Sequence, residues 1–443
     1  MKLNTRQTIR IGFAFLSICA FWQMYNSVIP LMLTNTFAMN ETFSGMIMAA
    51  DNVLALFLLP LFGAFSDQCK SPLGKRRPFI LLGTLLAVVF MTFIPVLDNA
   101  YFKMPSAYQE ILFICVLGVL LVAMGIYRSP AVALMPDVTP KPLRSRANAI
   151  INLMGAVGGI LYLVIASFMY SSEKTKGLAH VDYLPLFLVV AGIMLVSLVI
   201  VMGTVPERKL QEQMEAYEKA HSEDNLAKED ERGNEVLPGD VKRSLAFLLV
   251  SIAFWFIGYN AVETWFTTFA GRMWGMSLGG ASLCLTVATG GAILSYIPVG
   301  QIASRVGRRK TIMGGVILLT VCFFVAFMYT WFFHEFHPAL YVLFLLVGLA
   351  WAAINVNSLP MVLEMCKGSE VGKFTGYYYT FSMAAQIVTP IVAGFLLNHI
   401  GYNALFLYAA VFVFASFLTM TMVRHGDNRI VAKKGLEAYD VED

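Results

Sequence analysis

The chain has 443 residues, of which 58% are apolar and only 14% are charged, and its mean hydropathy is +0.68. A soluble globular protein carries about 25% charged residues, so this composition excludes an ordinary water-soluble domain. The apolar residues form blocks of about 20 or more, the length that a helix needs to cross a bilayer. They do not alternate as the strands of a membrane β-barrel do.

Twelve such blocks follow one another along the chain and predict an all-α, polytopic membrane protein. We expect no cleaved leader, because the first apolar run is longer than a signal-peptide core. The predicted spans are residues 10–33, 42–65, 78–97, 109–134, 147–170, 183–205, 244–270, 280–303, 311–332, 339–363, 374–397 and 403–423.

The basic residues are distributed unevenly between the connections. Twenty-seven of the 32 lysines and arginines fall on the side that holds both termini, and four fall on the other side. The positive-inside rule therefore predicts cytoplasmic termini in a multi-pass protein of the cell membrane. None of the six cysteines lies in a predicted outer loop, so we expect no disulfide framework.

A charged segment, residues 206–243, divides the chain into two sets of six spans. We interpret it as a solvated, partly helical cytoplasmic linker; a regulatory docking site is the alternative. The expected domains are thus an N-terminal bundle (1–205), this linker, a C-terminal bundle (244–423) and a cytoplasmic tail (424–443).

The two sets of spans carry a related turn. After the second span the chain reads Gly63, Asp67, Gly74, Lys75, Arg76 and Arg77, and after the eighth it reads Gly300, Ser304, Gly307, Arg308, Arg309 and Lys310. Parallel repeats of six spans describe the major facilitator architecture. The sequence therefore predicts two pseudo-symmetric six-helix bundles.

The turn SDQCKSPLGKRRPFI (66–80) resembles the loop of sucrose and other disaccharide proton symporters, which share an Arg-x-Gly-Arg-Arg-x-Pro pattern. Gly74, Arg76 and Pro78 fit this pattern, whereas Pro72 and Lys75 depart from it. The loop also looks like that of the glycoside–pentoside–hexuronide cation symporters. Further stretches resemble bacterial relatives of the disaccharide symporters: YRSPAVALMPDV (127–138), GYNAVETWF (258–266), INVNSLPMVLEM (354–365) and GYYYTFSMAAQIVTP (376–390).

Three ionisable residues lie within predicted spans, where each charge requires a reason. Asp51 can bind and release a proton if burial and a nearby cation balance each other; a fixed ion pair is the alternative. Arg128 suits a carboxylate or two sugar hydroxyls. The plant-type symporters place their arginine after a Pro-Ala pair, where this chain has Val132, so Arg128 lies one turn earlier. We expect Asp51 and Arg128 to couple transport to protons.

Glu263 lies in the seventh span, on one face with Asn260, Thr264 and Thr267. We expect Glu263 and Asn260 to contact substrate, although proton transfer and a purely structural role remain open for Glu263. Weaker candidates are amide, hydroxyl and aromatic residues that suit sugar hydroxyls and ring faces: Gln23, Asn26, Asn152, Asn355, Tyr377, Gln386 and Trp265. For any one of these, packing between helices is the alternative role.

The charges at the cytoplasmic ends of the spans are expected to act as a gate rather than to bind substrate. This set is Asp67, Arg76, Arg77, Asp137, Arg144, Arg146, Arg308 and Arg309.

The expected function is proton-coupled symport of a disaccharide or related glycoside. A sodium-coupled glycoside carrier and an exporter of another small solute remain alternatives. We expect a monomer in the bilayer that binds a sugar and protons, with no nucleic acid, cofactor or metal. No pattern of nucleophile and base, metal ligands or nucleotide loop indicates an enzyme.

Overall fold

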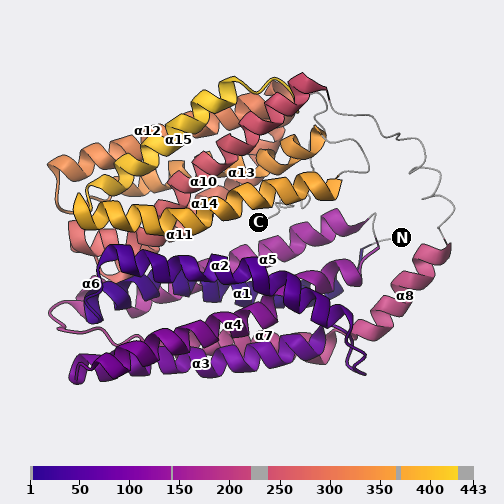
Figure 1. Ribbon diagram of the computed structural model, residues 1–443, viewed down its shortest axis with the longest axis horizontal. Helices are drawn as coiled ribbons and strands as arrows, with labels where there is room; N and C mark the ends of the chain where they lie inside the picture. The colour runs from indigo at the N-terminus through magenta and orange to yellow at the C-terminus, as the bar shows by residue number, and fades with distance from the viewer. Residues whose placement is uncertain (1–2, 141–142, 221–237, 366–370, 428–443) are drawn as a thin grey trace. The chain divides into compact units, whose positions relative to one another are not determined.

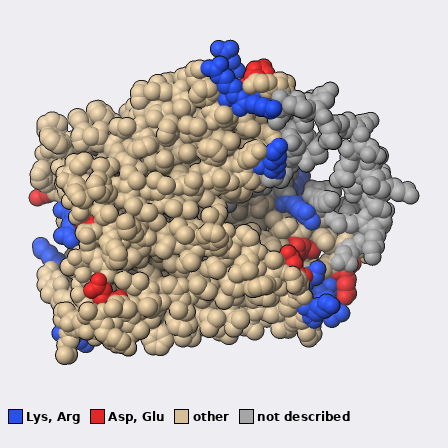
Figure 2. Space-filling view, viewed as in Figure 1, with Lys and Arg blue, Asp and Glu red and all other residues tan. Residues whose placement is uncertain are grey.

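The computed structural model describes residues 3–140, 143–220, 238–365 and 371–427. Twelve of its helices are long and apolar enough to cross a membrane, which confirms the predicted number of spans. The fold is all-helical within these residues (Figure 1). On the face shown in Figure 2, the charged side chains gather near helix ends, and the middles of the helices present uncharged residues. The protein is therefore a multi-pass membrane protein.

The helices of the first half follow the predicted spans closely. They are α1 (Thr5–Leu31), which continues as the π-helical segment η1 (Met32–Thr36), α2 (Glu41–Asp67), α3 (Arg77–Lys103), α4 (Ala107–Asp137), α5 (Arg144–Met169), the single turn α6 (Ser172–Thr175), α7 (Leu184–Thr204) and α8 (Glu207–Ala220). The predicted linker thus begins with a helix. Its residues 221–237 lie outside the described residues.

The second half contains six long helices. They are α10 (Gly239–Trp274), α11 (Leu278–Val306), α12 (Arg308–Phe332), α13 (Leu340–Glu364), α14 (Val371–His399) and α15 (Ala404–Thr421). Seven of the long helices of the chain contain an internal proline more than one turn from their N-terminus. Membrane helices tolerate such prolines because neighbouring groups satisfy the freed carbonyls. Most of the predicted tail, residues 428–443, lies outside the described residues.

Two compact units emerge from the contacts between residues. Unit 1 comprises Met1–Asn40, Ala50–Ala220 and Met276–Leu283, and unit 2 comprises Glu41–Ala49, His221–Gly275 and Cys284–Asp443. Unit 2 thus includes the start of α2, and unit 1 includes the start of α11. In unit 1, α1 packs on α5 and α7, and α3 packs on α4 and α7. In unit 2, α10 packs on α14 and α15, and α12 packs on α13 and α15.

Close helix approach in unit 1 depends on small residues. A side chain at Gly158 of α5 would collide with the main-chain carbonyl of Leu16 on α1, and one at Gly83 of α3 would collide with the main chain of Tyr127 on α4. Without a hydrophobic driving force inside the bilayer, membrane helices associate through such close packing. These contacts hold α1 and α4, the helices that carry Trp22 and Arg128, in fixed positions.

Candidate functional site

A pocket inside unit 1 contains both ionisable residues that were expected to couple transport. Its lining combines Asp51 of α2, Arg128 of α4 and Trp22 of α1 with the apolar residues Ala55, Leu58, Leu59, Leu121 and Met124 and with Gly125. The spacing within the spans alone did not show that these three side chains would share one pocket.

Asp51 and Arg128 line this pocket without forming an ion pair within 4.0 Å. Asp51 Oδ1 accepts hydrogen bonds from the main-chain N–H of Asn52 at 2.6 Å and from its side-chain amide at 2.8 Å. The Arg128 guanidinium lies 5.8 Å from the centre of the Trp22 ring, within the range of a cation–π contact. The Trp22 indole N–H has no hydrogen-bond partner among the described residues. The pocket therefore holds a charged donor, a neutral donor and a carboxylate with remaining bonding capacity.

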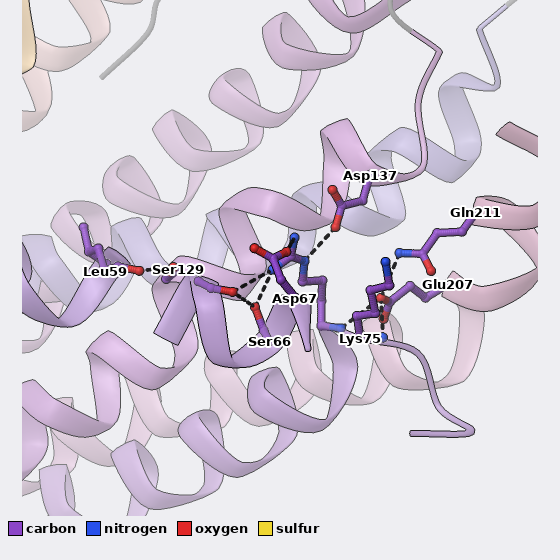
Figure 3. A network of polar contacts seen from close by, with 10 residues as sticks. Leu59, Ser66, Asp67, Lys75, Ser129, Asp137, Glu207 and Gln211 are labelled. Atoms are coloured by element: carbon purple, nitrogen blue, oxygen red, sulfur yellow. Dashed lines mark hydrogen bonds and ion pairs between the residues drawn. The ribbon is translucent and has the colours of Figure 1, made fainter. Parts of the chain in front are cut away.

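The main chain of α2 and α4 is fixed next to this pocket. Ser129 follows Arg128 and donates its hydroxyl to the Leu59 carbonyl of α2 at 2.7 Å, as Figure 3 shows. Membrane helices use such hydroxyls to bond across a helix pair. This bond keeps the α4 segment that carries Arg128 against the α2 helix that carries Asp51.

The other expected polar residues of unit 1 lie on α1 and α5. Gln23 of α1 faces Gly159 of α5, since a Cβ at Gly159 would lie 3.9 Å from its side-chain oxygen. Asn26 and Asn152 are half-buried on α1 and α5. The structure thus places all three in unit 1, but none of them lines the pocket.

In unit 2, the expected residues of α10 differ in their surroundings. Asn260 is buried and its amide nitrogen has no hydrogen-bond partner among the described residues, and Glu263 is half-buried. Trp265 is fully buried and donates its indole N–H to the Pro390 carbonyl at 3.3 Å. That contact packs α10 against α14, which is the alternative role considered for Trp265.

The remaining expected residues of unit 2 lie on α13 and α14. Asn355 is buried, Gln386 is half-buried and Tyr377 is exposed. The Trp351 ring of α13 stacks on the Tyr259 ring of α10, with centroids 3.7 Å apart and planes 7° apart. The pattern of apolar and polar residues did not predict this ring pair.

Arg76 is the centre of a second polar cluster, at the end of unit 1 where α2 and α4 end. Figure 3 shows its acidic members Asp67 and Asp137. Its Nε contacts Asp137 at 2.6 Å and one terminal nitrogen contacts Asp67 at 2.5 Å. The other terminal nitrogen donates to the Ser66 hydroxyl and to the Gly63 carbonyl. Burial lowers the pKa of Arg76, but the Asp137 and Asp67 carboxylates raise it more, so the guanidinium stays charged.

Glu207, which was not among the expected residues, completes this cluster. Its fully buried carboxylate accepts the main-chain N–H groups of Lys75, Arg76 and Arg77 at 2.8, 2.9 and 3.0 Å. N–H groups at the start of a helix have no acceptor within the helix itself. The Glu207 carboxylate supplies that acceptor, and the helix dipole also favours a negative charge at this end of α3. Gly74 precedes them with φ +112°, and its missing side chain leaves room for the Glu207 carboxylate.

Unit 2 repeats this arrangement. Arg308 at the start of α12 contacts Glu364 at the end of α13 at 2.5 Å, as Arg76 contacts Asp137. The Arg308 N–H donates to Asp427 at 2.6 Å, as the N–H groups at the start of α3 donate to Glu207. An acidic residue shortly after the sixth and twelfth spans is the sequence signal that could have identified Glu207 and Asp427.

The other expected gate residues lie near the starts of α3, α5 and α12. Arg77 donates to the Met202 carbonyl of α7, and Arg309 donates to the Thr421 carbonyl of α15 at 2.9 Å. Arg144 donates to the Thr139 carbonyl at 3.1 Å rather than to an acidic residue of the Arg76 cluster. Arg146 is exposed on α5.

The family model of the Major Facilitator Superfamily matches residues 11–279 and 269–437. The chain belongs to the major facilitator superfamily. This confirms the superfamily and the all-helical fold that the repeated turns indicated. Within the described residues, no group of three or more His, Cys, Asp or Glu side chains could hold a metal ion.

Curated relatives of this superfamily member are transporters by name. The sucrose transport protein SUC3 of Arabidopsis thaliana is 31% identical over 140 residues, which cover 28% of this chain and 23% of that protein. The human proton-associated sugar transporter A is 27% identical over 164 residues, covering 36% and 22%. These matches therefore span less than a quarter of each relative's length.

Solved structures of low sequence identity share the fold along most of the chain. A bacterial homologue of the iron transporter ferroportin has a TM-score of 0.69 at 11% identity and covers 95% of this chain and 99% of its own. The xylose transporter XylE from E. coli has a TM-score of 0.64 at 11% identity, with the same coverage. At such identities the likeness concerns the fold alone.

Proposed function

We propose that this major facilitator protein is a proton-coupled symporter of a disaccharide or related glycoside that works by alternating access. The observation that carries the proposal is the pocket in unit 1, where Asp51 and Arg128 face a shared space beside Trp22 without forming an ion pair. A carboxylate in this position can exchange a proton, and a guanidinium can bind sugar hydroxyls. The names of the sucrose and proton-associated sugar transporters support the same substrate class.

In the proposed cycle, Asp51 carries the coupled proton and Arg128 responds to its charge. Arg128 and Trp22 bind the sugar from unit 1. From unit 2 the proposed contacts are Glu263, Asn260, Asn355 and Gln386, with Tyr377 as a further candidate. A sugar offers hydroxyls to the amides and acids and an apolar ring face to the aromatic side chains.

Coupling to a proton supplies the energy for accumulation. A membrane potential of ~100 mV contributes about 2.3 kcal/mol for each charge moved. Because 1.4 kcal/mol corresponds to a factor of ten, one proton supports roughly fifty-fold accumulation of a neutral sugar before any pH gradient is added.

We place the protein in the cell membrane as a monomer with both termini in the cytoplasm, where the basic residues of the connections concentrate.

Uptake of a labelled disaccharide into proteoliposomes, under separately imposed proton and sodium gradients, tests this function. We expect accumulation that follows the proton gradient and collapses with a protonophore. Uptake that follows the sodium gradient would show that sodium, not the proton, is the coupling ion. Transport in the outward direction alone would indicate an exporter. Asp51→Asn is expected to abolish accumulation and to leave sugar exchange intact. Accumulation at the wild-type level in this variant would exclude Asp51 as the proton carrier.

A further inference from the structure

Asp98 is a buried carboxylate of unit 1 that is not among the residues lining the pocket. It is near the C-terminal end of α3, whereas Arg76 is next to the N-terminal end, and the helix is ~40 Å long at 1.5 Å per residue. Its side chain is 0% exposed. The His180 ring, in the connection between α5 and α7, places Nε2 3.4 Å from Asp98 Oδ2.

The Asp98 carboxyl group has few partners that could stabilise a negative charge. Neither oxygen makes a hydrogen bond to a described residue, and no described lysine or arginine lies within 4.0 Å of it. The Thr36 hydroxyl of η1 lies beside it and offsets part of the cost of a negative charge there. A buried carboxylate with no neighbouring lysine or arginine is costly, so this site favours a proton on the carboxyl or on the neighbouring imidazole.

His180 also holds the connection between α5 and α7, residues 170–183, against the end of α3. Its Nε2 lies 2.8 Å from Asn99 Oδ1, and the Asn99 amide donates to Asp182 Oδ1 at 2.7 Å. Asp182 Oδ1 in turn accepts the Leu184 N–H at the start of α7 at 2.9 Å. The Phe102 ring stacks on the imidazole with centroids 4.4 Å apart and planes 12° apart. One side chain therefore links the connection, α3 and α7.

We propose that Asp98 and His180 form a proton-binding site, separate from the pocket of Asp51 and Arg128, which holds the connection between α5 and α7 on the end of α3 while the pair shares one proton. Loss of that proton leaves a buried carboxylate beside a neutral imidazole and releases the connection. This site does not depend on the sugar or on the coupling ion.

The groups around the pair support one shared proton. Burial lowers the pKa of His180, and the Asp182 carboxylate offsets part of that effect, so the imidazole is neutral near pH 7. Burial raises the pKa of Tyr170 to about 12, helped by Asp182, and burial and Asp98 raise that of Tyr183. Both phenols stay neutral. Asp182, which is hydrogen bonded to Asn99, is a charged group that acts on both members of the pair.

The direction of the pH dependence follows from proton counts in the bound and released connection. Below about pH 6.5, the ordinary value for histidine, both states hold one proton, on Asp98 when bound and on His180 when released. Above that pH the released state loses its proton and the bound state retains one. Binding of the connection therefore weakens as the pH rises above about 6.5, by at most about tenfold per pH unit for one linked proton.

Hydrogen–deuterium exchange of the full-length protein in lipid nanodiscs tests the proposal. Protection factors of peptides that cover residues 170–183, corrected for the intrinsic exchange rate, are measured from pH 5.5 to 8.5. We expect wild-type protection to be constant up to about pH 6.5 and to fall by up to about tenfold per unit above it. In Asp98→Asn, which has no carboxyl proton to lose, protection should stay constant above about pH 6.5 and should fall below it, where only the released state binds a proton, on His180.

Two further variants separate proton binding from a merely structural role. His180→Gln keeps a donor for Asn99 and removes the imidazole, so the fall in protection should begin below pH 6.5, since the released state then holds no proton. His334→Gln, in the exposed connection between α12 and α13, is the matched control and should behave as wild type. Constant wild-type protection would overturn the proposal. A wild-type pH dependence in Asp98→Asn would also overturn it. If Asp98→Asn does not fold, the pH dependence of protection in wild type and in His180→Gln tests the proposal.

Discussion

Arg76 and Asp137 are joined by a 2.6 Å contact between Nε and Oδ2, although 61 residues separate them in the chain. Arg76 lies in the turn before α3 and Asp137 is the last residue of α4. The same guanidinium contacts Asp67, at the end of α2. One arginine thus ties the ends of three helices of unit 1 together, and Arg308 and Glu364 repeat the first of these contacts in unit 2.

The two carboxylates on Arg76 are expected to contribute unequally. The Asp137 side chain is 29% exposed and that of Asp67 is 62% exposed, and exposed ion pairs contribute less than about 1 kcal/mol. Asp137→Asn should therefore lower the thermal unfolding midpoint of the purified protein more than Asp67→Asn does. Equal unfolding midpoints for the two variants, or a lower midpoint for Asp67→Asn, would contradict this ranking.

Glu207→Ala is expected to destabilise the start of α3, because three main-chain N–H groups lose their acceptor. Loss of a helix cap costs up to about 2 kcal/mol, and this cap is fully buried. Glu212→Ala on the same helix is the matched control, since its pair with Arg208 is exposed on both sides; it should change the stability by less than about 0.5 kcal/mol. Unfolding in a detergent series measures both variants. Equal stabilities would show that the cap does not stabilise unit 1.

Arg308→Gln should destabilise unit 2 through loss of its contact with Glu364. The two side chains are 17% and 13% exposed, and removal of one member of a buried pair costs about 3 kcal/mol. Arg305→Gln, three residues earlier and exposed, removes the same charge without a buried partner. We expect only the first variant to lower the midpoint of unfolding clearly. If both variants behave alike, the effect is one of net charge rather than of this contact.

Two adjacent glycines of α5 should respond differently to alanine. A Cβ at Gly158 collides with the Leu16 carbonyl of α1, whereas a Cβ at Gly159 meets only the Gln23 side-chain oxygen at 3.9 Å. Overpacking costs about 1–3 kcal/mol, so Gly158→Ala should unfold at lower temperature or express poorly. Gly159→Ala should resemble wild type in the same assays. Tolerance of Gly158→Ala would mean that α1 and α5 can separate without loss of stability.

The amino-acid sequence by itself determined the membrane class, the number of spans and the repeated basic turn, because each depends on neighbouring residues. A block of about 20 apolar residues is a local signal, and so is the Gly74–Arg77 turn. Asp51 and Arg128 were also identifiable, since a charge inside an apolar block stands out from its surroundings.

Only the tertiary structure decided which of these charges meet and which further residues join them. Glu207 reaches the start of α3 across about 130 residues of chain, and Asp98 meets His180 because the connection between α5 and α7 folds back onto α3. Such contacts depend on the rotation and tilt of each helix. Packing against neighbouring helices sets both of these, and hydrophobicity along one chain segment does not encode them.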